Sequence, residues 1–402
     1  MSILVLAIIA MLAQQTIATT AKLGMPAMFP TIAADLGFDP KFALAYTWGY
    51  AVCGIVVMAG CGGALRRWGA LRTSQIGCVM MAGGLAAAAL LAHPWLALPP
   101  LVLGVILNSG GSTVATPASS QILAKYAPPK WAPLVFSIKQ TGVPAGLAIS
   151  GMILAPAAAA YGWRGALMGL AVVCLLIAIG LQPLRAEFDR DRDPTARPRW
   201  SDFPNTIRDV VGNTDLKVLA IAAFCFVGMQ SVFMGFSITY LHEALGLAVE
   251  EAGPLFGAAA LIAVPARIFW GWIGSALVAP RVLLAGLAAL MAISTAAMGG
   301  FSDAWSQTEI FLVLAFVSLT VLSWHGILLS EAARLAPIGE AGRMTGGVLA
   351  FGSAGQVIYP PLFGVGDFLG GYGLAYIAIG LPALLVGYIL LRAEYRSRKP
   401  LL

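Results

Sequence analysis

The chain has 402 residues, of which 59% are hydrophobic and 10% charged, with a formal net charge of +6. A soluble domain averages about 25% charged residues, and a single aqueous core stops growing at about 250–300 residues. This composition excludes a soluble globular protein and predicts an all-α membrane protein whose surface is covered by lipid.

Long apolar runs predict the helices. A helix needs about 20 apolar residues to cross a ~30 Å hydrocarbon core. The chain contains twelve such runs, near residues 3–31, 42–65, 72–92, 97–124, 132–158, 162–184, 215–241, 252–276, 280–300, 307–334, 342–367 and 372–392. The first run has no basic region before it, and we expect it to be an uncleaved span. The long, charged connection 185–214 is the predicted cytoplasmic linker between an N-terminal six-helix bundle (1–184) and a C-terminal one (215–402).

Basic residues indicate the orientation of these spans. With both termini in the cytoplasm, most of the 24 Lys and Arg residues fall in inside loops, whereas Lys41 and Arg164 fall in outside loops. Positive charge gathers on the cytoplasmic side of membrane proteins. We therefore expect a multi-pass protein of a bacterial inner membrane with both termini inside. The basic balance does not indicate nucleic-acid binding, because no basic helix lies outside the spans.

The two halves repeat each other in short segments. The sequence AKYAP at 124–128 is followed 209 positions later by ARLAP at 333–337. Tyr-Gly pairs at 161–162 and 372–373 recur at nearly the same spacing, 211 positions. Short apolar matches arise easily by chance, but two near-equal offsets favour a parallel repeat of six helices around a pseudo-twofold axis.

Twelve helices in a six-plus-six arrangement with a charged central loop resemble the major facilitator superfamily across essentially the whole chain. The segment GGALRRWG at 62–69 is similar to that family's loop between helices two and three, although Arg66 stands where the family has an acid. The resemblance implies gating residues at Arg67 and Gly69, and a loosened fifth helix around Pro144. Because the family's acid helps to lock the cytoplasmic side, we do not transfer that latch to this chain. We expect a monomer without a cofactor.

One segment of the eighth helix carries a narrower resemblance. The stretch PARIFWGW at 265–272 is similar to the segment in which oxalate–formate antiporters and monocarboxylate transporters place a substrate-binding arginine. The resemblance assigns Arg267 to an anionic substrate. Lys22 in the first helix is similar to a lysine of the monocarboxylate transporters.

Three basic residues, Lys22, Lys139 and Arg267, lie well inside the predicted spans, away from the span ends. Each cation near the centre of a bilayer costs about 2.5–3.5 kcal/mol on insertion scales. No Asp or Glu lies deep in any predicted span, so we expect an anionic ligand to accompany these cations. Arg267 can bind a carboxylate with two parallel hydrogen bonds. Lys139 has the alternative of reaching the cytoplasmic surface or belonging to a gate, and Lys22 that of an outer structural role.

Polar residues of the spans are the remaining candidates for substrate binding. They are Gln15, Thr19, Asn108, Gln140, Gln230, Tyr240, His325, Gln356 and Tyr359. The alternative for each is a hydrogen bond that joins two helices. Because histidine ordinarily changes charge near neutral pH, His325 is, with Glu331, a candidate for proton coupling; the alternative for His325 is a packing role. The five cysteines have no metal-ligand spacing, and we expect no metal.

These features predict a secondary transporter for a small organic anion, such as a mono- or dicarboxylate, working by alternating access. Proton symport and anion exchange both remain open. The alternative is an efflux pump for lipophilic drugs or other small molecules, although exporters of cations usually need a carboxylate in the membrane. An enzyme is disfavoured because the sequence has no HExxH, GxSxG or P-loop motif, and a receptor because no signalling domain is present.

Overall fold

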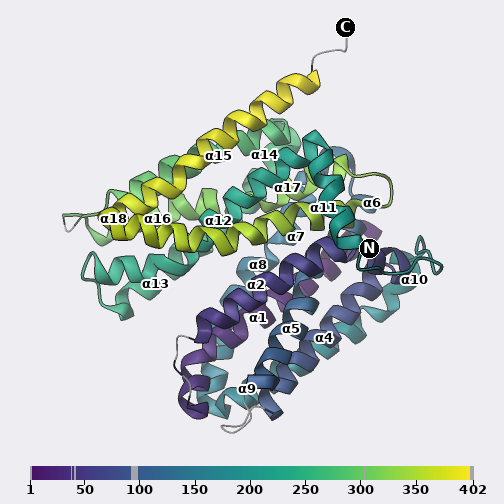
Figure 1. Cartoon of the computed structure of the whole chain (residues 1–402), viewed down its shortest axis with the longest axis horizontal. Helices are drawn as coiled ribbons and strands as arrows, with labels where there is room; N and C mark the ends of the chain where they lie inside the picture. The colour runs from purple at the N-terminus through teal and green to yellow at the C-terminus, as the bar shows by residue number, and fades with distance from the viewer. Residues whose placement is uncertain (1, 38, 40–41, 92–97, 303, 399–402) are drawn as a thin grey trace. The chain divides into compact units, whose positions relative to one another are not determined.

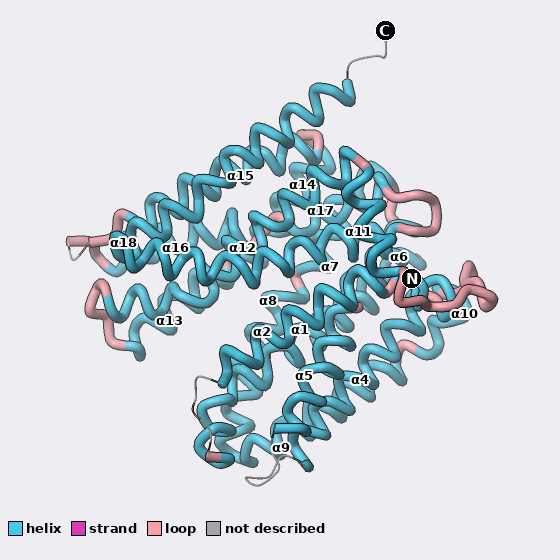
Figure 2. The backbone as a smooth tube through the Cα atoms, viewed as in Figure 1, coloured by secondary structure: helices cyan, strands magenta, loops and turns pink. Residues whose placement is uncertain are grey.

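The computed structural model describes residues 2–37, 39, 42–91, 98–302 and 304–398. Helices are the regular structure throughout this part of the chain, as Figure 2 shows. Residues 92 and 97, the predicted ends of two spans, lie outside the described ranges. The all-α fold class predicted from composition is confirmed.

The chain divides into two compact units. Unit 1 comprises Met1–Ala127, Lys139–Asp209 and Ala336–Ala350, and unit 2 comprises Pro128–Ile138, Val210–Leu335 and Phe351–Leu402. Each unit therefore contains a short segment from the other half of the sequence. In unit 1 the Gln121 side chain donates to Gly339 O (2.6 Å) and accepts from Gly342 N (2.7 Å). These bonds attach Ala336–Ala350 to unit 1.

Figure 1 labels the helices in chain order. The N-terminal half contains α1 (Ile3–Leu36), α2 (Phe42–Gly60), α3 (Gly62–Trp68), α4 (Ala70–Leu91), α5 (Leu98–Thr113), α6 (Ala115–Tyr126), α7 (Ala132–Gln140), α8 (Gly142–Ile149) and α9 (Ala155–Gly180), with short helices η1 (Pro129–Trp131), η2 (Ser150–Leu154) and η3 (Gln182–Leu184). The linker forms α10 (Arg185–Phe188) and α11 (Asp202–Gly212). The C-terminal half contains α12 (Thr214–Glu243), α13 (Val249–Leu261), α14 (Ala263–Ala276), α15 (Pro280–Gly299), α16 (Gln307–Val321), α17 (His325–Leu335) and α18 (Ala341–Arg398).

Helical segments occupy each of the twelve predicted ranges. Within the described residues, nine helices are long and apolar enough to cross a membrane, and a tenth span arises if α2 and α3, bent by 55°, count as one. The two last predicted spans share α18, which breaks at Gly370 and Gly371. The predicted fifth span is divided among the shorter helices α7, α8 and η2.

Two spans break at corresponding places in the repeat. The fourth span is interrupted at Val114, between α5 and α6, and the tenth at residues 322–324, between α16 and α17. The offset of 209 seen in the sequence carries Val114 onto Ser323. Interrupted helices at matching positions of two halves are typical of substrate sites in transporters, because the break releases backbone groups from the helical pattern.

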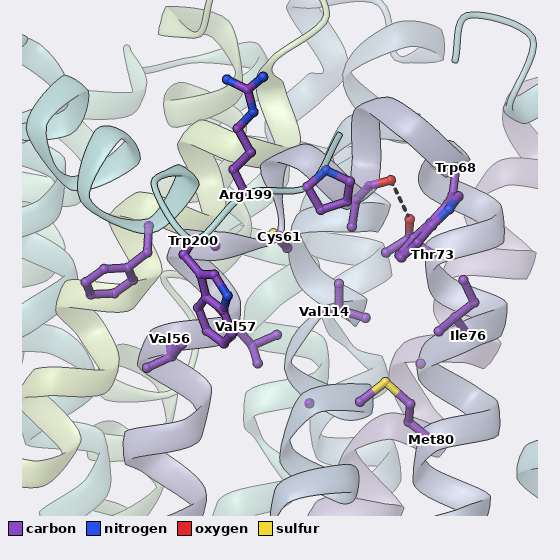
Figure 3. A pocket seen from close by; sticks show the side chains of 16 residues that line it. Val56, Val57, Cys61, Trp68, Thr73, Ile76, Met80, Val114, Arg199 and Trp200 are labelled. Atoms are coloured by element: carbon purple, nitrogen blue, oxygen red, sulfur yellow. Dashed lines mark hydrogen bonds between the residues drawn. The ribbon is translucent and has the colours of Figure 1, made fainter. Parts of the chain in front are cut away.

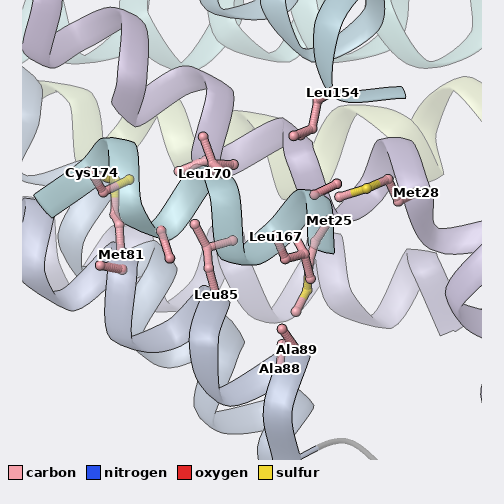
Figure 4. Close-up of a cluster of buried hydrophobic side chains, with 14 of the residues drawn as sticks. Met25, Met28, Met81, Leu85, Ala88, Ala89, Leu154, Leu167, Leu170 and Cys174 are labelled. Carbon is pink, nitrogen blue, oxygen red and sulfur yellow. The ribbon is translucent and has the colours of Figure 1, made fainter. Parts of the chain in front are cut away.

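An apolar core holds unit 1 together. Most of its side chains come from α1, α4 and α9, and Figure 4 shows members such as Met25, Leu85 and Leu167 turned toward one another. Met25 is 1% exposed and Leu85 and Leu167 are 0% exposed. This core fixes α1, which carries the polar residues described next.

Candidate functional site

Unit 1 contains a buried polar cluster around Lys139. Lys139, at the end of α7, is 1% exposed. Its Nζ donates to Gln15 Oε1 (2.6 Å) and Gln140 Oε1 (3.3 Å). Gln15 Oε1 also accepts from Thr116 Oγ1 (3.1 Å), and Gln15 Nε2 donates to Thr19 Oγ1 (3.5 Å). Four residues predicted from the sequence, Lys139, Gln15, Gln140 and Thr19, thus lie in one cluster.

Close packing of α8 on α1 explains why Lys139 reaches Gln15. A Cβ added at Gly146 would lie 2.6 Å from both Thr16 O and Thr19 Cβ, so the two helices can approach this closely only without a side chain there. The helical hydrogen bonds break at Thr141, between α7 and α8. Backbone packing therefore directs the buried lysine at α1.

A second polar group in unit 1 surrounds Lys22. The Lys22 Nζ lies 5.4 Å from the centre of the Tyr50 ring, a cation–π geometry, and the Tyr50 hydroxyl bonds to Ser112. Asn108 Nδ2 donates to Ala21 O (2.8 Å) and Tyr46 OH (3.2 Å). Lys22 and Asn108 therefore share a region with two tyrosines that the sequence analysis missed. A helical spacing of four residues between tyrosines on α2 was the available signal.

Arg267 is the corresponding buried cation of unit 2. It lies in α14 and is 2% exposed. The neighbouring Trp270 donates from Nε1 to Leu319 O (2.8 Å), which holds α14 against α16. Leu134 N of unit 2 donates to Ser275 Oγ (3.0 Å), so α7 fixes α14 as well. These two bonds attach the helix that carries Arg267 to its neighbours in unit 2.

Other predicted residues of unit 2 lie at several different places. His325 begins α17 at the helix break and stacks on Trp324, with ring centres 3.7 Å apart. Tyr240 donates to Met298 O (3.2 Å) and stacks on two other aromatic rings. Tyr359 packs against Phe224. Gln230 and Gln356 are half-buried.

Glu331 belongs to a buried ion-pair network. Its carboxylate accepts from Arg281 Nε (2.7 Å) and from Arg334 Nε and Nη2 (2.7 Å each). Arg281 also donates to Asp215 (2.8 Å). Arg281, which the sequence did not single out as a buried cation, lies in the first turn of α15 and is 3% exposed. A carboxylate held by two guanidinium groups is poorly suited to exchange a proton, so we assign Glu331 a structural role.

Two of the candidate gating residues, Arg67 and Gly69, lie where the linker meets α3 and α4. Gly69 has φ +88°, and a Cβ there would collide with the Asp189 side chain. Asp189 accepts from Leu71 N (2.7 Å) and Arg72 N (2.9 Å) and so caps α4. Burial raises the pKa of the Asp189 carboxyl, and these two hydrogen bonds act in the opposite direction.

Arg66 and Arg67 are held by groups far away in the sequence. Arg66 pairs with Asp202 (3.7 Å) and Glu340 (3.4 Å), and Arg67 donates to Ala196 O (3.1 Å). A base at the position of the family's acid is thus matched by acids on the facing segments. Pro144 is buried in α8. Among the described residues, no group of three His, Cys, Asp or Glu side chains is arranged to hold a metal.

Helical spans in two units, each with buried polar groups, define a multi-pass membrane protein built as membrane transporters are. A family model described as Major Facilitator Superfamily matches residues 3–346. The chain therefore belongs to the Major Facilitator Superfamily, as the sequence motifs indicated.

Known proteins share this fold. The chain is 26% identical over 304 residues to the uncharacterized MFS-type transporters MT3072 and Rv2994 of Mycobacterium tuberculosis, an alignment covering 74% of this chain and 66% of theirs. It is similar in structure to the E. coli fucose:proton symporter FucP (TM-score 0.70, 17% identity, 98% of both chains). It is also similar to the human organic anion transporter MFSD10 (TM-score 0.74, 13% identity, 97% of this chain and 100% of that one).

Proposed function

We propose that the chain is a secondary active transporter that moves a small organic anion, a mono- or dicarboxylate, across the membrane by alternating access. Solved structures of this fold include a fucose symporter and an organic anion transporter. Fold likeness at such low identity does not choose a substrate. The proposal therefore depends on the chemistry of the buried side chains.

The Lys139 cluster is the observation that carries the proposal. The hydrogen bonds from Lys139 to Gln15 and Gln140 end on neutral amide oxygens. Such bonds satisfy ammonium donors but do not cancel the positive charge of the lysine. Electrostatic interactions with that charge are strong in a low-dielectric interior. An anion that replaces an amide oxygen would gain a charge-assisted hydrogen bond, which is roughly twice as strong as a neutral one.

Arg267 supports the same assignment from unit 2. A guanidinium offers five N–H donors in a planar fork that matches a carboxylate. Burying it at 2% exposure is costly, and binding of an anion would offset that cost during transport. We therefore assign Lys139 to anion binding in unit 1, with Gln15, Gln140 and Thr116 orienting the lysine, and Arg267 to anion binding in unit 2.

Uptake and ligand-induced stabilisation test the proposal. Purified protein is reconstituted in vesicles and assayed with a panel of radiolabelled carboxylates, and the same compounds are screened by thermal shift. A carboxylate at about 100 times its Kd should stabilise the wild type by ~2.7 kcal/mol. Lys139→Gln and Arg267→Gln should lose both signals. Lys217→Gln, which changes an exposed lysine of α12, is the matched control and should keep them.

The assay also has outcomes against the proposal. Stabilisation by lipophilic cations or neutral drugs, unaffected by either substitution, would support the efflux alternative and contradict anion transport. Retention of carboxylate uptake in both variants would remove Lys139 and Arg267 from the site.

For coupling we propose His325, because Glu331 is held in ion pairs. Histidine is the side chain that ordinarily changes charge near neutral pH, and His325 lies half-buried at the break between α16 and α17. Uptake driven by a proton gradient should be lost in His325→Gln while exchange of internal for external substrate persists. Loss of both activities in this variant would instead indicate a packing role beside Trp324.

A further inference from the structure

A pocket in unit 1 lies between α2, α3 and α4, under the linker. Its volume is about 360 Å³. We call it the linker pocket; its lining is Val56, Val57, Gly60, Cys61, Ala64, Trp68, Thr73, Ile76, Gly77, Met80, Gly110, Val114, Pro198, Arg199, Trp200 and Phe203. Figure 3 shows Ile76 and Met80 at the end far from Arg199. The pocket is distinct from the polar cluster around Lys139, with which it shares no residue.

The interior of the linker pocket is lined mainly by apolar groups. Two lining side chains with small polar groups are already bonded to the backbone: Thr73 Oγ1 donates to Gly69 O (2.6 Å), and Cys61 Sγ donates to Met58 O (3.3 Å). Apart from Arg199, the rest of the lining is apolar or glycine, with valine, isoleucine, methionine, phenylalanine and tryptophan side chains beside small residues and a proline. An empty apolar cavity forfeits dispersion contacts along its walls, so an apolar chain is the ligand that these walls fit.

The pocket borders an exposed apolar surface of unit 1. Val52 and Val56 on α2 and Val79 on α4 are exposed large hydrophobic residues on helices of membrane-spanning character. Hydrocarbon can therefore enter from the side without crossing water. This location favours a lipid over a solute that arrives from the aqueous phase.

The linker forms a fixed roof over the pocket. A Cβ at Gly63 would collide with the Asp202 carboxylate and lie 2.7 Å from Pro198 Cα, so the linker lies directly on α3. Asp202 pairs with Arg66 and accepts from Arg199 N (3.0 Å). The roof is thus part of the folded unit.

The mouth of the pocket has the composition of a membrane interface with positive charge. Trp200 is 94% exposed and Trp68 37% exposed. Arg197 and Arg199 are exposed on the same segment, and the Arg199 side chain points away from the pocket interior in Figure 3. Tryptophan favours the headgroup level of a bilayer, and an arginine there attracts anionic lipid.

We propose that the linker pocket binds one acyl chain of an anionic phospholipid, with the phosphate placed at Arg199 and the chain extending toward Met80. The apolar walls select a hydrocarbon chain, and the arginines of the roof select the charge of the headgroup. Cytoplasmic placement of this lipid follows from the predicted orientation, whereas the site itself does not depend on it. The bound lipid ties the linker to α2 and α4.

Native mass spectrometry tests the site on the full chain. Protein is released from nanodiscs of equal phosphatidylglycerol and phosphatidylcholine, and the retained lipid is counted. Gly60→Leu should fill the pocket, because a Cβ there meets only Phe203 Cβ, at 4.0 Å. We expect wild type to retain phosphatidylglycerol and Gly60→Leu to lose it. Gly180→Leu, at an exposed glycine with nothing within 4 Å, is the matched control and should retain it.

The headgroup contact has its own variant pair. Arg199→Gln should lower the preference for phosphatidylglycerol over phosphatidylcholine about fivefold, the contribution of one basic residue near an anionic surface. Arg190→Gln changes another exposed arginine of the linker and should leave the preference unchanged. Equal retention of the two lipids by wild type, or an equal response to both arginine substitutions, would contradict the headgroup assignment.

A fluorescence measurement keeps the proposal testable if Gly60→Leu fails to fold. Phosphatidylglycerol brominated on its acyl chain should quench wild-type emission more than it quenches the emission of Trp200→Phe, because Trp200 lines the pocket. Identical fractional quenching in the two proteins, or unchanged lipid retention in a folded Gly60→Leu, would overturn the site. These readouts concern lipid alone, so they stand or fall separately from anion transport.

Discussion

Lys139 in unit 1 and Arg281 in unit 2 are both buried cations, 1% and 3% exposed, yet their surroundings differ in kind. Arg281 donates to the carboxylates of Glu331 (2.7 Å) and Asp215 (2.8 Å). Lys139 donates to the amide oxygens of Gln15 and Gln140. The first site neutralises its own charge, whereas these two hydrogen bonds of the second site end on groups that carry no charge.

This difference assigns the Arg281 network to the stability of the fold and the Lys139 cluster to ligand binding. Disrupting a buried ion pair strongly destabilises a protein, because removal of one partner leaves the charge of the other uncompensated. A buried charge on neutral partners keeps its attraction for an anion. We therefore expect substitutions in the Arg281 network to change stability, and substitutions around Lys139 to change binding.

The largest expected effect is on the network of unit 2. Glu331→Gln should lower the free energy of unfolding by about 3–5 kcal/mol, because it leaves Arg281 and Arg334 without this carboxylate. Chemical denaturation in mild detergent measures the change. Asp191→Asn removes a more exposed carboxylate, which pairs with Lys125 at 3.2 Å, and should cost less than about 1 kcal/mol. Equal losses in the two variants would contradict a structural role for Glu331.

The next largest effect is expected from a substitution that gives Lys139 a carboxylate partner, as Arg281 has in unit 2. Gln15→Glu places a carboxylate beside Lys139 and should weaken anion binding about 10- to 100-fold, the ~1.5–3 kcal/mol of a hydrogen bond to a charged group. Stability should be retained, because the new pair is internally compensated. Gln15→Met is the control at the same position and leaves the lysine charge in place, so its affinity should stay above that of Gln15→Glu. A higher affinity for the anion in Gln15→Glu than in Gln15→Met would contradict the proposed difference between the two sites.

A smaller effect is expected at the linker. Asp189→Ala removes the cap of α4 and should lower the free energy of unfolding by about 1–2 kcal/mol without changing the affinity for the anion. Asp193→Ala changes an exposed linker acid and should stay within about 0.5 kcal/mol of wild type. A loss of affinity in Asp189→Ala would indicate that the linker communicates with the site.

The smallest effect concerns Lys22. Its ammonium lies over Tyr50, and a cation–π contact contributes about 0.5–1 kcal/mol at a site that retains solvent. Lys22→Met should reduce stability by about that amount and leave anion affinity nearly unchanged. A loss of affinity comparable to that of Gln15→Glu would place Lys22 in the substrate site, as the resemblance to monocarboxylate transporters implies.

The sequence predicted the apolar spans and the two halves because hydrophobic length is a local property. It also identified Lys139 and Gln15, since a polar residue inside a span is costly wherever it points. It did not predict that Glu331 pairs with Arg281, fifty positions earlier, or that the acids facing Arg66 come from Asp202 and Glu340. Pairings of this kind depend on which helix faces meet, and helix packing is set by many weak contacts at once.

A comparison of isosteres tests the central claim, that the cargo is an anion, most directly. Thermal stabilisation of the wild type is measured with each small carboxylate and with its uncharged primary amide, which has nearly the same shape. The account predicts that at least one carboxylate stabilises the protein, that its amide does not, and that the difference disappears in Gln15→Glu. Equal stabilisation by a carboxylate and its amide, unchanged in that variant, would contradict it.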